Sequence, residues 1–478
     1  MNQNQPIHNL KGKKVHFIGI GGIGMSALAR YFHADGSVVS GSDKEKSYLI
    51  SELEQEGITN IWIPHNKKNI EQINPDYIIY STAITASNEE IIWGKERNKT
   101  LLHRADLLQT AIGSKNLISV SGTHGKTTTS AMITEIFLGA NLNPSAIIGG
   151  LLIDKNSNTV VGNGEHFIIE ADESDKSFLK GNPVIAVITN IEADHLENYP
   201  GGIDEIKSSF LEFASKALLN KGLIACIQDP ITKDLLEKNF SLNNPKLITY
   251  GIAGKCNSPI ISAKYNIKEK SWDIFYKNEL KTSIKLRHPG EHNILNALAA
   301  FGVGSLVGII PEKIKESLET YKGTKRRFQV ISQSKELIIV DDYAHHPTEI
   351  KKSIEAAYEI KPKRLIIVVQ PHQPVRLRDL WDQYKEVFKH ETSPVYITDT
   401  FIARGSEIPG ISSQKLVKEI NKSNVNYLPG SIEEITNHLK NILQPEDFIL
   451  IMGAGDITNL GPKLLQSDYL LTSNTGNN

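Results

Sequence analysis

Short apolar runs alternate with longer stretches of mixed, helix-like pattern along most of the chain. Near the N-terminus these runs predict strands over 14–18, 37–40 and 77–80, with a helix over 25–33. A short run that is almost entirely apolar is typical of a strand buried on both faces of a sheet. Strands that alternate with helices in this way form parallel sheets whose faces the helices cover.

The same pattern recurs twice more. It predicts strands over 117–120, 167–169 and 184–189 in the middle of the chain, a helix over 293–307, and strands over 337–340, 365–369, 395–398 and 448–452 near the end. Residues 260–286 instead alternate between polar and apolar, which predicts antiparallel strands. We therefore expect an α/β protein of three domains: a Rossmann-like domain over 1–113, a central α/β domain with extra antiparallel strands over 114–322, and a second Rossmann-like domain over 323–478.

Composition narrows the function classes. The 478 residues carry a formal net charge of −1, which argues against a nucleic acid or a membrane surface as partner. The start of the chain lacks the apolar core of a signal peptide, and no apolar run reaches the ~18 residues that a membrane span needs. Two cysteines are too few for a disulfide framework. We expect a cytoplasmic protein.

Residues 121–129 read Ser-Gly-Thr-His-Gly-Lys-Thr-Thr-Thr and follow the predicted strand 117–120. A strand that runs into a glycine turn and then Lys-Thr is typical of a phosphate-binding loop, in which backbone N–H groups and a helix N-terminus face the phosphates. Lys126 would reach the β- and γ-phosphates, and the Thr127 hydroxyl would bind Mg²⁺. The match departs from the standard loop at Val120, where that loop has glycine. The central domain is accordingly predicted to bind ATP.

Gly19, Gly21 and Gly24 fit a G-x-G-x-x-G turn between a strand and a helix, and Asp43 ends the next predicted strand. This spacing is the fingerprint of a dinucleotide site with its ribose-binding acid. The physical chemistry requires only that a diphosphate approach a bare backbone at a helix N-terminus. NAD and a nucleotide sugar such as a UDP derivative both meet that requirement.

Acidic and basic side chains gather where other predicted strands end. Glu170 follows the strand 167–169 and is a candidate for holding Mg²⁺, with Asp172, Glu173 and Asp175 as rivals. His195 lies beyond the end of strand 184–189 and is a candidate for a second metal ligand. These positions support ATP chemistry at the phosphate loop.

Three further groups carry candidate chemistry. Asn293 and Asn296 lie three residues apart at the start of a predicted helix, so that both amides can face one ligand such as an adenine edge. The basic segment 324–327 lies at a domain boundary, where an arginine could contact a transferring phosphate. Residues 341–349 and 370–378 end two predicted strands of the last domain and suggest a binding crevice there.

Taken in order, these motifs resemble the Mur ligases of bacterial cell-wall synthesis, and the resemblance runs from His16 to Asp456. Within that family, the opening 19–26 is similar to that of the members that add L-alanine to UDP-N-acetylmuramate. The resemblance implies domains for the UDP-sugar, ATP and the amino acid, in that order. It also implies the reaction: the lactyl carboxylate attacks the γ-phosphate of ATP, and the amine of L-alanine then attacks the acyl phosphate.

The family motifs assign roles residue by residue. The predicted catalytic residues are Lys126, Glu170 (rather than Glu173), His195, Arg327, Asp342 and His346, and the predicted metal ligands are Thr127, Glu170 and His195. The predicted ATP-binding residues are Gly122, Thr123, His124, Gly125, Lys126, Thr127, Thr128, His292, Asn293, Asn296 and Arg327. The predicted UDP-sugar residues are Gly19, Gly21, Gly22, Gly24, Met25, Ser26, Asp43, His65 (as a uracil contact) and Ser81. The predicted amino-acid site holds Tyr343, His345, His372 and Arg376.

The chemistry agrees with these roles. A carboxylate that attacks an anionic nucleotide is repelled by it, and two Mg²⁺, Lys126 and an arginine would offset that repulsion. The amine must lose a proton, and His345 or His346 would titrate near neutral pH. Arg376 could pair with the alanine carboxylate as a two-pronged donor. Gln373-Pro374 stands where the family often carries another basic residue, which leaves the details of alanine recognition open.

Other readings explain less of the chain. A Rossmann oxidoreductase accounts only for the first domain, and a phosphate-loop regulator needs neither a second nucleotide site nor a third domain. Folate-polyglutamate ligases share the middle domain alone. The near alternative is the recycling ligase that attaches a preformed tripeptide to the same UDP-sugar. The sequence leaves open whether the protein is a monomer or a weak homo-oligomer.

Overall fold

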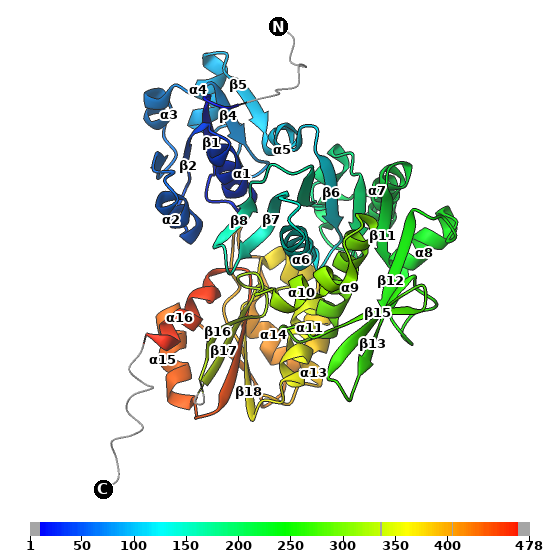
Figure 1. The fold of residues 1–478 in the computed structure, drawn as a ribbon. Coiled ribbons are helices and arrows are strands. Elements are labelled where there is room, and N and C mark those ends of the chain that lie inside the picture. The colour runs from blue at the N-terminus through cyan, green and yellow to red at the C-terminus, as the bar shows by residue number, and fades with distance from the viewer. Residues whose placement is uncertain (1–9, 335–336, 404, 467–478) are drawn as a thin grey trace. The chain divides into compact units, whose positions relative to one another are not determined.

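The computed structural model describes residues 10–334, 337–403 and 405–466. Residues 1–9, on which the expected lack of a signal peptide partly rests, lie outside this range. The chain divides into two compact units (Figure 1). The first comprises 1–287 and 294–322, and the second comprises 288–293 and 323–478.

The first sheet occupies the N-terminal part of the first unit. Its strands are β1 (Lys14–Ile18), β2 (Val38–Ser42), β3 (Ile61–Trp62), β4 (Tyr77–Tyr80) and β5 (Thr100–His103), and its helices are α1 (Ile23–Ala34), α2 (Tyr48–Gln55), α3 (Lys67–Ile73), α4 (Glu89–Glu96) and α5 (Arg104–Ile112). The strand order is β3-β2-β1-β4-β5, and every pair is parallel. The connections run to opposite sides of β1, so the sheet has a switch point between β1 and β4, where ligands of such folds bind.

The second sheet, of ten strands, is the core of the central domain. Its strands are β6 (Asn116–Ser121), β7 (Ser145–Leu152), β8 (Ser157–Val160), β9 (His166–Glu170), β10 (Ile185–Ile188), β11 (Gly222–Cys226), β12 (Leu247–Ile252), β13 (Ile261–Asn266), β14 (Ser271–Tyr276) and β15 (Glu279–Ile284). The helices are α6 (Lys126–Gly139), α7 (Gly202–Leu219), α8 (Pro230–Asn239), α9 (Glu291–Leu306) and α10 (Pro311–Thr320), with short 3₁₀ turns η1 (Ser177–Lys180) and η2 (Leu196–Asn198).

Strand β10 shows why the middle of this sheet reads as continuous apolar runs. All four of its residues are buried, and alternate ones join different clusters: Ala186 and Ile188 pack on the side of α7, while Ile185 and Val187 pack on the side of α6 and α9. Both faces are therefore covered. The order β15-β14-β13-β12-β11-β10-β6-β9-β7-β8 places the predicted antiparallel strands β13–β15 at one end.

Helix α1 fastens the first sheet to the second within the first unit. The buried Arg30 donates from Nη1 to Asn158 Oδ1 at 2.8 Å, and Asn158 Nδ2 donates to the Ile23 carbonyl at 2.9 Å. Arg30 also pairs with Glu56 at the end of α2. These bonds fix the helix that begins at the glycine turn against strand β8.

The second unit holds a six-stranded sheet in the order β16-β17-β21-β18-β19-β20, in which only β16 is antiparallel to its neighbour. Its strands are β16 (Gln329–Gln333), β17 (Leu337–Asp342), β18 (Arg364–Val369), β19 (Val395–Ile397), β20 (Val425–Tyr427) and β21 (Asp447–Met452). Its helices are α11 (Pro347–Glu359), α12 (Pro374–Asp379), α13 (Trp381–Lys389), α14 (Ser413–Ile420), α15 (Ile432–Ile442) and α16 (Leu460–Leu465), with η3 over Asp456–Asn459.

The predicted fold class, three α/β domains with antiparallel strands added to the central one, is confirmed. The strands β3, β5, β16 and β20, which are short or partly exposed at sheet edges, were not predicted, and neither were β7, β8, β11 and β12 of the central sheet. Within the described residues, no helix is both long and apolar enough to cross a membrane.

Candidate active site

Two glycines shape the loop between β6 and α6. Gly122 has φ 137°, and a Cβ there would lie 2.1 Å from Thr189 Oγ1. Gly125 has φ 82°, and a Cβ there would lie 2.5 Å from Asn296 Oδ1. Both positions therefore require glycine. The loop leads directly into α6, whose N-terminus carries the partial positive charge that attracts phosphate.

Asn190, just after β10, holds this loop in place. Its carbonyl oxygen accepts from Thr123 N–H at 3.2 Å, and its side-chain Oδ1 accepts from His124 N–H at 2.9 Å. Its Nδ2 donates back to the His124 carbonyl at 3.0 Å. Two backbone N–H groups of the loop are thus bonded to Asn190. Asn190 was not among the predicted site residues.

Lys126, the first residue of α6, points back into the loop. Its Nζ donates to the carbonyls of Gly122 at 2.6 Å and Thr123 at 3.2 Å, and to Glu173 Oε1 at 2.9 Å. Burial would lower the pKa of this ammonium, but the charges of Glu173, Glu170 and Asp172 outweigh that effect and raise the pKa. Lys126 is therefore a fixed positive charge at the mouth of the loop.

Four acids, Glu170 at the end of β9 and Asp172, Glu173 and Asp175 just after it, have different partners. Glu170 Oε2 accepts from Gly149 N–H at 2.9 Å, and a Cβ at Gly149 would lie 2.2 Å from that oxygen. Glu173 instead pairs with Lys126. Asp172 and Asp175 lie 3.6 Å and 3.2 Å from Arg104 Nη2. The acidic stretch is thus divided among three partners.

Arg104, the first residue of α5, borders the candidate site, and the sequence did not indicate it. Besides Asp172 and Asp175 it borders the glycine turn, because a Cβ at Gly24 would lie 3.0 Å from its Nη1. It thus contacts both the first domain's glycine turn and the acidic loop of the central domain. The segments that Arg104 contacts are distant from it in sequence, and no local motif marks an arginine at the start of a helix as part of such a site.

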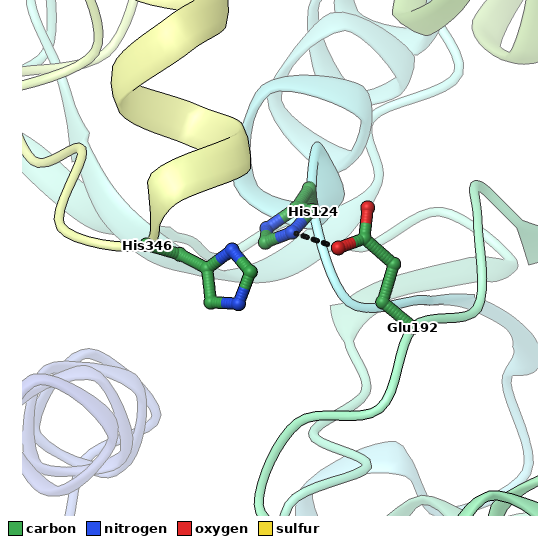
Figure 2. A group of neighbouring side chains, drawn as sticks. All are labelled: His124, Glu192 and His346. Atoms are coloured by element: carbon green, nitrogen blue, oxygen red, sulfur yellow. Dashed lines mark ion pairs between the residues drawn. The ribbon is translucent and has the colours of Figure 1, made fainter. Parts of the chain in front are cut away.

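The loop after β10 carries His195, whose backbone is left-handed with φ 55°. Its N–H donates to Asp194 Oδ1 at 2.8 Å, and its Nε2 lies 3.6 Å from Asp194 Oδ2. In the same loop Glu192 pairs with His124 at 3.4 Å (Figure 2). Because β10, β6 and β9 are adjacent parallel strands, their carboxyl ends bring Asn190, the phosphate loop and Glu170 to one edge of the sheet.

Helix α9 supplies the predicted amides. Asn296 Oδ1 accepts from Thr129 Oγ1 at 3.2 Å and lies against Gly125, so it borders the phosphate loop. Asn293 belongs to the second unit, where its Nδ2 donates to the Pro289 carbonyl at 2.6 Å. Burial lowers the pKa of the neighbouring His292 to about 4, so this ring is neutral at pH 7.

The predicted UDP-sugar residues follow the strands of the first sheet. Asp43 comes directly after β2, and its Oδ2 accepts from Gly21 N–H at 2.7 Å while its Oδ1 accepts from Lys44 N–H. The acid expected to bind a ribose thus closes the glycine turn here. Met25 and Ser26 are buried within α1, where Ser26 Oγ donates to the Ile23 carbonyl.

The other predicted UDP-sugar residues lie at the carboxyl edge of the first sheet. Gly19 turns the chain after β1 with φ 81°, and Gly22 precedes the first residue of α1. His65 follows β3, and its Nδ1 lies 2.8 Å from Ser42 Oγ at the end of β2. Ser81 follows β4 and is half-buried. These residues lie at the carboxyl edge of one parallel sheet.

In the second unit the predicted amino-acid residues form a continuous row. The Arg327 guanidinium lies 5.2 Å from the Tyr343 ring, Tyr343 meets His345 edge-on at 5.4 Å, and His345 meets His372 edge-on at 5.4 Å. His372 Nδ1 lies 3.4 Å from Arg376 Nη1. Phe401, which the sequence did not indicate, stacks on His372 at 5.8 Å.

The expectation that His345 titrates near neutral pH is wrong. Burial lowers its pKa to about 4, and the nearby Glu349 only partly offsets this effect. Its Nδ1 donates to the Tyr343 carbonyl at 2.9 Å, which leaves Nε2 as an acceptor. His346 caps α11, with its Nδ1 accepting from Thr348 N–H at 3.3 Å.

Asp342 ends β17 in a buried position. Its Oδ1 accepts from Ala344 N–H at 2.9 Å and its Oδ2 from Ser353 Oγ at 2.7 Å. Burial nevertheless dominates and raises the pKa of this carboxyl to about 6. A carboxyl that must ionise in such a place destabilises the fold.

Asp342→Asn is expected to stabilise the protein above neutral pH. A raised pKa contributes stability that is present below pH 3.8 and is lost as the pH rises through about 6. Each pH unit between the two pKa values corresponds to about 1.4 kcal/mol, so the gain at pH 8 is at most about 3 kcal/mol and vanishes near pH 4. Urea unfolding at both pH values measures it. The exposed Asp382→Asn serves as control, and an equal gain at both pH values would contradict the burial argument.

Known proteins share this architecture and are similar in sequence. Residues 14–115 match the Mur ligase family catalytic domain, 120–304 the Mur ligase middle domain, and 326–455 the Mur ligase glutamate ligase domain. The UDP-N-acetylmuramate–L-alanine ligase of Carboxydothermus hydrogenoformans is 38% identical over 94% of this chain and 96% of its own. That of Clostridium kluyveri is 40% identical over 95% and 98%.

A solved structure shares the fold along nearly its whole length. The UDP-N-acetylmuramate–alanine ligase of Thermotoga maritima superposes with a TM-score of 0.79 at 24% identity, covering 95% of this chain and 98% of the other. Three successive Mur ligase domains match within residues 14–455, and the two relatives align over 94% and 95% of the chain. The chain belongs to the Mur ligase family.

Proposed function

We propose that this protein joins L-alanine to the lactyl carboxylate of UDP-N-acetylmuramate, with ATP converted to ADP and phosphate. The observation that carries the proposal is the edge formed by β10, β6 and β9, where Asn190, the phosphate loop with Lys126, and Glu170 come together. The full-length relatives named as UDP-N-acetylmuramate–L-alanine ligases support the choice of substrates.

Lys126 is the residue that meets the phosphates. Its ammonium is held by two loop carbonyls and by Glu173, so it is already oriented toward the loop before ATP binds. A preorganised cation offsets the charge that builds up as the carboxylate attacks the γ-phosphate, and it needs little rearrangement to do so. Glu173 keeps the ammonium in place while the nucleotide exchanges.

The residues at this edge fit Mg²⁺ in kind. Thr127 offers a hydroxyl and Glu170 a carboxylate that bonds one backbone N–H, and both are oxygen ligands of the type that Mg²⁺ prefers. His195 would contribute an imidazole at a second position. When bound, Mg²⁺ would neutralise phosphate charge during transfer. The chain's own part is to hold these donors near the carboxyl ends of adjacent strands.

L-Alanine, whose amine attacks the acyl phosphate, is proposed to bind along the row of side chains that runs from Arg327 to Arg376. Arg376 carries a guanidinium that can take the alanine carboxylate through two N–H groups. The neutral His345 presents its Nε2 as a hydrogen-bond acceptor. An amine that donates a hydrogen bond to this nitrogen has its own lone pair directed away from the ring, where it can attack the acyl carbon.

The test is phosphate release from ATP and Mg²⁺ in the presence of UDP-N-acetylmuramate, with and without L-alanine. Release that requires both, with a product heavier by one alanine residue, would support the proposal. Release with the tripeptide L-alanyl-γ-D-glutamyl-meso-diaminopimelate but not with alanine would assign the protein to the recycling ligases. A murein peptide ligase of Psychrobacter arcticus shares the fold at a TM-score of 0.71, which makes this arm necessary.

Arg376→Ala is expected to raise the KM for alanine by about 10–100-fold and to change the KM for ATP by less than about threefold, because a charge-assisted pair is lost only at the amino-acid carboxylate. Arg378→Ala is the matched control, since Arg378 lies on the same helix, is exposed and pairs with Asp379. Steady-state kinetics with each substrate varied measures both constants. Equal effects on alanine and ATP would contradict the carboxylate assignment.

A further inference from the structure

Glu90, in the first turn of α4, is fully buried and bonded to three neighbouring segments. Its Oε2 lies 3.4 Å from His16 Nε2 of β1 and accepts from Ser42 Oγ at the end of β2. Its Oε1 accepts from Asn66 N–H at 3.2 Å, next to His65. No role in the proposed reaction uses this carboxylate, although a buried acid is costly unless its surroundings require it.

The surroundings keep Glu90 ionised. Burial would raise its pKa, but the hydrogen bond and charge of His16 and the hydrogen bonds from Ser42 and Asn66 lower it below the ordinary glutamate value. An ionised carboxylate has no hydrogen and can only accept. The single hydroxyl hydrogen of Ser42 must therefore point to Glu90.

This leaves Ser42 with lone pairs for its other neighbour. His65 Nδ1 lies 2.8 Å from Ser42 Oγ, so Nδ1 must carry a hydrogen and donate it. In the neutral ring the remaining nitrogen, Nε2, then has a lone pair and accepts. Within the described part of the chain no hydrogen bond involves Nε2, and the His65 side chain is 19% exposed.

His65 stands at a suitable place for the base of a nucleotide. It follows β3, which lies two strands from β1 and its glycine turn, a separation of roughly 10 Å. If the diphosphate lies on the glycine turn, the ribose spans the region of β2 and the base reaches β3. An accepting nitrogen there matches the N3–H of uracil, whereas cytosine presents an accepting N3 and would leave two lone pairs facing each other.

We infer that Glu90, acting through Ser42, is a positioning residue that holds His65 in the tautomer with Nε2 as acceptor, and that this tautomer makes the first domain select a uracil over a cytosine nucleotide. The inference rests on the proposed function, because it specifies how the UDP end of the substrate is recognised. A site built to accept an N–H rejects an analogue that lacks it, since a polar group is left unpaired.

The tautomer is measured directly by long-range ¹H–¹⁵N correlation spectra of the full-length protein labelled in histidine. The His65 signals are identified by their loss in His65→Gln. The expected spectrum shows a protonated Nδ1 and an unprotonated Nε2, and both Ser42→Ala and Glu90→Gln should give a mixture of tautomers. A wild-type ring with its hydrogen on Nε2 would overturn the inference.

Selectivity is measured by calorimetric binding of UDP and CDP. The wild-type protein should favour UDP by at least about tenfold, and Ser42→Ala should reduce that ratio to within about threefold of one. Glu89→Gln is the matched control, because this neighbour on α4 is exposed and accepts only from Lys67 N–H among the described hydrogen bonds. It should keep the wild-type ratio.

The outcomes separate the inference from the function on which it rests. Equal affinity for UDP and CDP in an active ligase would overturn the inference and leave the function standing. A ratio that Ser42→Ala does not change would also overturn it. Binding of neither nucleotide would contradict the proposed UDP-sugar site. Should Glu90→Gln fail to fold, Ser42→Ala carries the test, because it removes one hydroxyl and no charge.

Discussion

Lys126→Ala is expected to lower kcat by at least about 10³-fold, because removing a preorganised cation from a phosphoryl-transfer site removes stabilisation that water cannot replace. The ammonium is already held at the loop by Gly122, Thr123 and Glu173. Affinity for UDP-N-acetylmuramate should change by less than about threefold, since the glycine turn that is proposed to bind it lies on another sheet. Phosphate release and calorimetric titration measure the two effects.

The same substitution has a structural cost that must be separated from the catalytic one. It leaves Glu173, which is 5% exposed, buried without its cation, and breaking such a pair typically costs about 3–5 kcal/mol. The double variant Lys126→Ala, Glu173→Gln should regain most of that stability and none of the activity. Lys155→Ala, on a surface ion pair of the same domain, is the control. Activity restored in the double variant, or lost UDP-sugar affinity in the single one, would contradict the assignment.

Much of the fold could be predicted because many of its strands are buried on both faces. Runs such as 185–188 and 365–369 have no polar position that solvent would require, and so they stand out in the sequence. Two exceptions, β11 and β12, are fully buried but include Gly222, Thr249 and Gly251, and others lie at the edges of sheets. Strand β3 has only two residues and β16 is half-exposed, so neither carries a distinctive pattern.

The phosphate loop could be predicted because its geometry is local. Gly122 and Gly125 are required by backbone torsion and by close approach, and both requirements appear as glycine in the sequence. Asn190 and Arg104 were missed because their roles arise only when distant segments meet. Nothing near them in sequence distinguishes them from ordinary polar residues.

Charge states were the least predictable feature. The sequence shows that His345 and Asp342 follow a strand, but it does not show that burial moves their pKa values in opposite directions, to about 4 and about 6. Asp43 gives a related lesson. Its spacing from the glycine turn predicted a ribose-binding role. In the structure its carboxylate instead accepts a hydrogen bond from Gly21 N–H of the turn itself.

The sequence likewise could not assign roles to the four acids at the end of β9 and just after it. Their spacing made Glu170 and Glu173 near-equal candidates for the metal, and the family resemblance favoured Glu170. The structure gives a physical reason for that choice: Glu173 is paired with Lys126, whereas Glu170 bonds a single backbone N–H and keeps lone pairs for a ligand. The two roles lead to different kinetic consequences.

Glu170→Gln is expected to lower kcat by about 10²–10³-fold at saturating Mg²⁺ and to raise the half-saturating Mg²⁺ concentration at least about tenfold, because an amide oxygen replaces a charged ligand. The fold should persist, since glutamine can still accept from Gly149 N–H. Initial rates measured across a Mg²⁺ series give both quantities, and Mn²⁺ binding followed by electron paramagnetic resonance in the presence of ADP reports the metal without turnover.

Two variants make that result specific. Glu165 is exposed and directly precedes the first residue of β9, so Glu165→Gln should behave as wild type. Glu173→Gln should leave the half-saturating Mg²⁺ concentration within about threefold of wild type, because its partner is the Lys126 ammonium and a neutral amide can still accept from it. If Glu173→Gln raises the Mg²⁺ requirement and Glu170→Gln does not, the two acids have exchanged roles, and Lys126 must then be held in the reacting state by contacts other than those seen with the loop at rest.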